Sequence, residues 1–274
     1  MVSAFFVELR LYGRLILMQI RTQMQYKFDM VLDILTFFFL TALEFGVLLI
    51  YFVPFPSLLG WHIGEVALLS SVVSTGFGLA ELFGGGIDNF DTVIRQGDFD
   101  RVLLRPVTAL IQVSTTQFRL RRLGRITQGL GAFVFSLYLL RTSHLIWTPL
   151  KVIALLLGIV SSSLIFIAAL LLGATVCFWT VETTELTNIL TYGGREMLSY
   201  PLSIYHQLAQ RIFVFIVPLA FGTYIPVCYV LSRPLPFGLP DALTFISPLV
   251  ALLFALAALA FWRFGVHHYQ STGS

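Results

Sequence analysis

Long apolar segments alternate with short polar ones along the whole chain. A helix needs roughly 20 apolar residues to cross a hydrocarbon core, and six segments meet this length: Val31–Val53, Trp61–Phe83, Ile126–His144, Val152–Thr180, Leu208–Leu231 and Pro248–Val266. The third is the weakest, because only fifteen uncharged residues separate Arg125 from Arg141. It must either include Arg141, with its guanidinium at the interface, or begin earlier. The pattern predicts an all-α polytopic membrane protein with six transmembrane helices.

The composition supports this interpretation. Hydrophobic residues make up 57% of the chain and charged residues 11%, with a mean hydropathy of +0.88. A soluble globular domain carries about 25% charged residues. Six crossings use most of the chain, so we expect one transmembrane domain over residues 1–274 and no large soluble domain.

The basic residues follow the predicted topology. If the N-terminus is cytoplasmic, all of the 17 lysines and arginines except Arg141, Lys151 and Arg233 fall on the cytoplasmic side. This bias matches the positive-inside rule for six spans with both termini cytoplasmic. The net charge of +3 therefore indicates membrane topology and gives no reason to expect a nucleic-acid partner.

The segment over residues 3–28 precedes the first span. Arg10, Arg14, Arg21 and Gln25 fall on one narrow stripe of a helix, and apolar side chains lie elsewhere around it. This pattern is typical of an amphipathic helix in the membrane interface. A simple basic anchor that sets the topology explains the same residues equally well.

The loop over residues 84–125 is the longest polar stretch. Asp88 as an N-cap and Gly97 after the last turn frame a short helix over Asn89–Gln96. Phe90, Val93 and Ile94 share one face of it. A helix of two turns is not stable alone, so this face must pack against the membrane, other parts of the chain or a groove in another protein.

A second loop, over residues 232–247, contains Pro234, Pro236 and Pro240, which predicts short helices on the extracellular side. Recognisable catalytic chemistry is absent from the sequence. Gly84–Gly86 lacks the lysine and the strand-to-helix context of a phosphate-binding loop, and the histidines lack zinc-like spacing. We therefore expect no ATP hydrolysis by this chain itself, no metal site and no cofactor.

Glu44 lies near the middle of the first predicted span. A charge at that depth costs roughly 3 kcal/mol on insertion scales and usually faces the bundle interior. It is either a carboxylate on a substrate path or a glutamate that holds helices together. Because we place no basic residue equally deep, a substrate path there favours cations or neutral amphiphiles.

Three segments resemble the ABC-2 type permeases, in particular the six-span subgroup of bacterial ABC exporters. They are RQGDFDRVLLRPV (95–107), YPLSIYHQLAQRIFVFIVPLAFGTYIPVCYVL (200–231) and HHYQSTGS (267–274). The resemblance implies six helices preceded by an interfacial helix, in a type V exporter-like architecture. It also implies a bacterial plasma membrane location and a second six-span permease, identical or paralogous.

The resemblance further implies two separately encoded ABC ATPase subunits, which bind the ATP and Mg. In such transporters a coupling helix between the second and third spans docks on the ATPase. On this chain that role falls on the predicted short helix and the glycine after it: Asn89, Phe90, Asp91, Val93, Ile94, Arg95, Gln96 and Gly97. We expect a permease subunit that moves a hydrophobic or amphiphilic, possibly cationic, substrate outward.

Two alternatives remain open. A proton- or sodium-coupled secondary carrier would use Glu44 as its titrating group, although such carriers commonly show internal repeats and none is visible here. A membrane enzyme or scaffold is disfavoured because no nucleophile or metal cluster lies at the end of a span.

Overall fold

The computed structural model describes residues 2–141, 145–180 and 187–270. In these ranges five helical stretches are long and apolar enough to cross a membrane, or up to six if one bent pair forms a single span. The chain is therefore an all-α polytopic membrane protein, as predicted. The five stretches contain α2 (Lys27–Tyr51), α3 (Ile63–Asp88), α7 (Leu123–Leu140), α8 (Pro149–Val176) and α14 (Ser247–His268).

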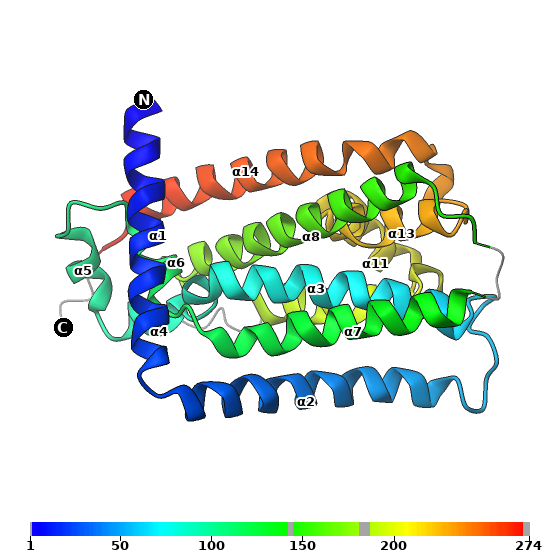
Figure 1. Ribbon diagram of the computed structural model, residues 1–274. Coiled ribbons are helices and arrows are strands. Elements are labelled where there is room, and N and C mark those ends of the chain that lie inside the picture. Colours follow the sequence, from blue (N-terminus) through cyan, green and yellow to red (C-terminus); the bar gives the residue numbers. More distant parts are fainter. Residues whose placement is uncertain (1, 142–144, 181–186, 271–274) are drawn as a thin grey trace.

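Helix α3 is the centre of the bundle. Of its most apolar window 89% is buried, against 11% for α2 and 28% for the stretch containing α14. Figure 1 shows α3 between α7 and α8, with α2 and α14 on opposite sides. Small residues allow this packing: a Cβ on Gly76 would lie 2.3 Å from Ser162 Oγ on α8. Small residues at helix interfaces let backbones approach closely within membranes.

Helix α1 (Val2–Met24) lies across one end of the bundle (Figure 1). Gln23 holds it there through two contacts: its Nε2 donates to the Phe118 carbonyl at 2.7 Å, and its Oε1 accepts from the Leu120 backbone N–H at 2.8 Å. This is the orientation expected of a helix lying in a membrane interface. We refer to this side of the molecule as the α1 end and to the opposite side as the far end.

Four short helices connect α3 to α7 at the α1 end: α4 (Phe90–Arg95), α5 (Asp98–Leu103), α6 (Ala109–Thr116) and η1 (Leu120–Arg122). Helix α4 occupies the short helix predicted over Asn89–Gln96. Gly97 follows it in the left-handed conformation, with φ 70°, which glycine adopts without the usual steric cost. The predicted cap is wrong, because Asp88 ends α3 and its Oδ2 accepts from the Tyr192 hydroxyl at 2.9 Å.

The fifth predicted span, over Leu208–Leu231, is not one continuous helix. The segment consists of α11 (Gln207–Arg211), η4 (Ile212–Ile216), α12 (Leu219–Gly222) and α13 (Tyr224–Val230), with a bend of 74° between Ile216 and Leu219. Val217 leaves the helical region, with φ −111° and ψ 89°, directly before Pro218. Proline lacks the backbone N–H and disfavours helical geometry in the residue before it, so the apolar run is broken there.

Before this broken segment the chain folds as η2 (Ile189–Gly193), α10 (Gly194–Leu198) and η3 (Leu202–Ile204). Helix α10 packs against α3 and α12, so it belongs to the helix bundle. At the far end, η5 (Pro236–Gly238) and η6 (Asp241–Ile246) lie within the loop predicted to contain short helices. The end of the third predicted span, at His144, lies outside the described residues.

Candidate functional site

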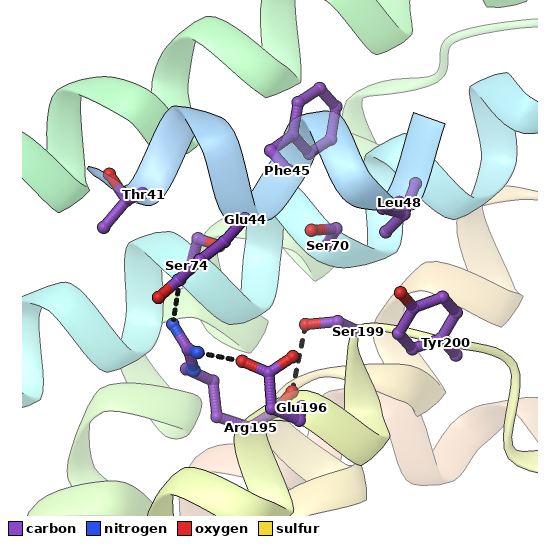
Figure 2. A pocket seen from close by; sticks show the side chains of 10 residues that line it. All are labelled: Thr41, Glu44, Phe45, Leu48, Ser70, Ser74, Arg195, Glu196, Ser199 and Tyr200. Carbon is purple, nitrogen blue, oxygen red and sulfur yellow. Dashed lines mark hydrogen bonds and ion pairs between the residues drawn. The ribbon is translucent and has the colours of Figure 1, made fainter. Parts of the chain in front are cut away.

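A chain of ion pairs crosses the interior of the bundle. Arg195 on α10 donates from Nη1 to Glu44 Oε2 on α2 at 2.9 Å, and Arg125 on α7 donates from Nη1 to the same oxygen at 3.4 Å. Arg125 Nε lies 2.9 Å from Glu81 Oε2 on α3. Arg195 also pairs with Glu196. These five residues, which we call the ion-pair chain, alternate in sign and connect four helices. Figure 2 shows the part formed by Glu44, Arg195 and Glu196.

The two arginines are deeply buried. The side chain of Arg125 is 6% exposed and that of Arg195 is 9% exposed, whereas that of Glu44 is 50% exposed. Both guanidinium groups also lie over the Phe77 ring, 5.4 Å and 5.6 Å from its centroid. Taking an unpaired charge out of water costs several kcal/mol, so each arginine depends on its carboxylate partners. Glu44 and Glu196 are the members of the chain that reach the protein surface.

The prediction that no basic residue lies as deep as Glu44 is wrong. The sequence placed Arg125 at the edge of a span and Arg195 in a loop. Helix α7 begins at Leu123 and carries Arg125 into the bundle, and α10 brings Arg195 onto α3. Both arginines compensate the negative charge of Glu44, which removes the basis for expecting a cationic substrate.

Arg195 is the residue of this site that sequence reasoning missed most clearly. One signal pointed to it, the Gly193–Gly194 pair directly before it. A Cβ on Gly194 would lie 2.8 Å from Leu219 Cδ1, so glycine favours the close approach of α10 to α12. Glycine pairs are also common in loops, and this pair alone did not predict a buried helix.

Two further polar contacts extend the ion-pair chain toward the α1 end. Arg122 donates to the backbone carbonyl of Glu81, and Tyr192 donates to Asp88. Arg122 is only 4% exposed. Arg122 and Arg125 thus join α3 to the Leu120–Leu140 stretch near the α1 end, which explains how two buried arginines are accommodated at the start of this span.

A small cleft opens beside Glu44 between α2 and α10. Its cavity has a volume of about 30 Å³, which is room for one or two water molecules. Hydroxyl groups and carboxylates line most of it, from Thr41, Ser70, Ser74, Ser199, Tyr200, Glu44 and Glu196 (Figure 2). A cleft lined this way in the membrane-spanning part of a protein suits water or a polar group better than a lipid chain.

The predicted docking helix has its apolar face turned inward. Phe90 is 0% exposed and Ile94 is 3% exposed, and Val93 is half-buried. Phe90 packs against the rings of Phe99, Phe178 and Trp262, with centroids 5.0 to 5.3 Å away. Of the partners left open for the face of Phe90, Val93 and Ile94, the structure shows other parts of the chain, because this face packs into the chain's own α1 end.

Tyr269, just after α14, closes this aromatic cluster against Phe99, with ring centroids 4.9 Å apart. Its partial burial raises the pKa of the Tyr269 hydroxyl above the usual value, and the neighbouring Asp100 carboxylate raises it further. The hydroxyl consequently remains protonated at physiological pH. The last spanning helix and the α4–α5 segment are thereby packed together.

Other residues of the predicted docking set do reach the surface. The Arg95 side chain is 52% exposed and pairs with Asp91 one turn earlier, and Gln96 is exposed. Asn89 is half-buried and its side chain donates to the Gly85 carbonyl at 3.2 Å. At the end of α5, Leu103 is 45% exposed and Leu104 is 85% exposed. We call Arg95, Gln96, Leu103 and Leu104 the α4–α5 surface.

The fold and the buried charges define a polytopic helical membrane protein whose apolar interior contains ion pairs. The family model for ABC-2 family transporter proteins matches residues 16–273. The chain therefore belongs to the ABC-2 transporter family, and it is a membrane-spanning transporter component. Neither a curated protein nor a solved structure matches it.

Proposed function

We propose that this protein is the permease subunit of an ATP-driven exporter. Two permease subunits, identical or paralogous, would assemble on two separately encoded ATPases that bind the ATP and Mg. The family match over residues 16–273 carries this proposal. The distribution of basic residues supports an orientation with the α1 end and both termini in the cytoplasm.

The contact with the ATPase is proposed to use the α4–α5 surface. Phe90 and Ile94 are buried in the chain itself, so they would transmit movement from this surface to Trp262 on α14. Leu104 is 85% exposed, the highest value for a large hydrophobic side chain among those that the structure describes. An apolar side chain in the cytoplasm at this exposure fits a groove on a partner protein.

The substrate class is inferred from the chemical character of the surfaces that a transport path would use. The exposed faces of α2 and α14 are apolar, and the cleft beside Glu44 carries both signs of charge. This combination supports a hydrophobic or amphiphilic substrate without a required net charge. A carrier driven by protons through Glu44 receives less support, because two arginines already bind that carboxylate.

The experiment is co-expression with the ATPase encoded beside this chain, followed by affinity purification through a tag on the permease. We expect the ATPase to co-purify, and Leu103→Asp with Leu104→Asp to reduce its recovery at least tenfold. The control is Leu59→Asp, a leucine at the far end whose exposure of 68% lies between those of Leu103 and Leu104. Transport that resists vanadate but stops with an uncoupler would contradict the proposal.

A further inference from the structure

An apolar groove lies on the surface between α7 and α8, toward the far end. Helix α3 packs against both of these helices, and α7 and α8 make few contacts with each other in the described residues. Figure 1 shows α3 passing between them. The resulting groove has a volume of about 220 Å³. Val72 forms part of its floor, and Leu130, Phe133, Leu155 and Leu156 are among its walls.

The chemistry of the groove selects an apolar occupant. A trapped water needs two to four polar partners, and the polar groups at the floor are the hydroxyls of Ser71 and Thr75. Ser71 already donates to the Leu68 carbonyl at 2.7 Å. The groove also opens sideways: Leu130 is 50% exposed and Leu156 is 59% exposed. In a membrane-spanning segment the molecules at such an opening are lipid chains.

The size of the groove suits about one acyl chain. At ~10–15 Å³ of this volume for each water-sized group, it holds on the order of 15 to 20 such groups. This corresponds to about one acyl chain and excludes a whole lipid. The remainder of the lipid must lie outside the groove, so the residues at its mouth decide which headgroup fits.

Aromatic and basic residues lie where α7 and α8 reach the far end. Trp147, 38% exposed, lines the end of the groove nearest the far end, and tryptophan is enriched at the membrane interface. Lys151 lies in the first turn of α8 next to Val152, which also lines the groove. Arg141 is exposed immediately after α7. The Lys151 ammonium donates to Ser232 Oγ at 3.2 Å, which leaves further donors for an anion.

We propose that this groove binds one phospholipid with an acidic headgroup, from the leaflet at the far end of the bundle. One acyl chain occupies the groove over Val72, and the phosphate lies against Lys151 and Arg141. This assignment rests on the membrane location of the helices and not on coupling to an ATPase. The test of this assignment is consequently independent of the proposed exporter function.

Native mass spectrometry of the purified full chain in detergent tests it, with phosphatidylglycerol and phosphatidylcholine as probes. We expect one tightly retained phosphatidylglycerol per chain and at least fivefold weaker retention of phosphatidylcholine. Leu156→Trp, which fills the groove, should reduce phosphatidylglycerol retention at least fivefold. Leu253→Trp is the matched control, because Leu253 on α14 is also 59% exposed but lies outside the groove.

A second variant leaves the packing of the groove intact. Arg141→Gln with Lys151→Gln should also reduce retention of phosphatidylglycerol at least fivefold, whereas Arg263→Gln, an exposed arginine on α14, should not. Equal retention by the wild type, the groove variant and the charge variant would overturn the proposal. Equal retention of the two lipids by the wild type would overturn it as well.

Discussion

The guanidinium of Arg195 and the carboxylate of Glu44 meet at 2.9 Å across the cleft between α10 and α2. The two residues are 151 positions apart in the sequence. Helix α2 is the least buried of the spanning helices and packs mainly on α7 and η1. The Glu44 contact therefore connects α2 directly to the segment that leads into the broken span.

A double-mutant cycle measures this contact. We expect Glu44→Gln and Arg195→Gln each to lower the melting temperature in detergent, since each removes a charged partner from the network. Arg125 and Arg195 lose Glu44 in the first variant, and Glu44 and Glu196 lose Arg195 in the second. Residues in one ion-pair network show coupling free energies of about 0.5–3 kcal/mol. The melting temperature of the double variant should thus fall by less than the sum of the decreases in the two single variants. Strict additivity would show that the two side chains do not interact in solution.

Glu196→Gln serves as the comparison within the same network. Its side chain is 58% exposed, and exposed ion pairs contribute about 0–1 kcal/mol. We expect a shift in melting temperature well below that of Arg195→Gln. A larger effect would show that the main partner of Arg195 is Glu196 and not Glu44 on α2.

The same contact should control access to the cleft. Ser74 lines the cavity and is 9% exposed. In a chain with Cys177→Ser and Cys228→Ala, a Ser74→Cys variant should react slowly with a charged thiol reagent. Adding Glu44→Gln removes the ionic contact between α2 and α10, so the labelling rate should rise several-fold. An unchanged rate would show that the cleft stays closed without this ion pair.

The aromatic cluster at the α1 end gives a prediction about stability. Truncating a fully buried phenylalanine in a core costs about 3–5 kcal/mol, so Phe90→Ala should strongly lower the melting temperature. Val93→Ala, at a half-buried position on the same helix, should cost much less. If Phe90→Ala instead keeps full stability and removes only ATPase binding, the inward packing of α4 is incorrect.

Close packing at Gly86 gives a test of the α3–α6 contact. A Cβ there would lie 1.8 Å from the Val113 carbonyl oxygen, whereas a Cβ on Gly131 in α7 would meet nothing within 4 Å. Gly86→Ala should therefore reduce the yield of folded protein, because α6 must move away. Gly131→Ala should be neutral or stabilising by about 0.5–1 kcal/mol, since alanine favours a helix over glycine. Thermal melts of both variants in one detergent compare them.

Hydrophobic periodicity and length determined the membrane-spanning helices, because the cost of exposing backbone in hydrocarbon leaves few other structures for a long apolar run. The short helix after α3 and its glycine at Gly97 were likewise readable from local rules. The break at Pro218 was harder to predict from local rules. Proline residues occur within membrane helices, and only the surrounding packing decides whether the chain bends there.

Tertiary structure decided which side chains meet. The sequence located Glu44 but could not show that Arg195 and Arg125 would compensate its charge, because that pairing depends on how α10 packs against α3. It likewise showed that Phe90 and Ile94 share a face, but not which partner covers that face. An apolar face has no directional preference of its own, and here Trp262 and Phe178, far along the sequence, occupy it.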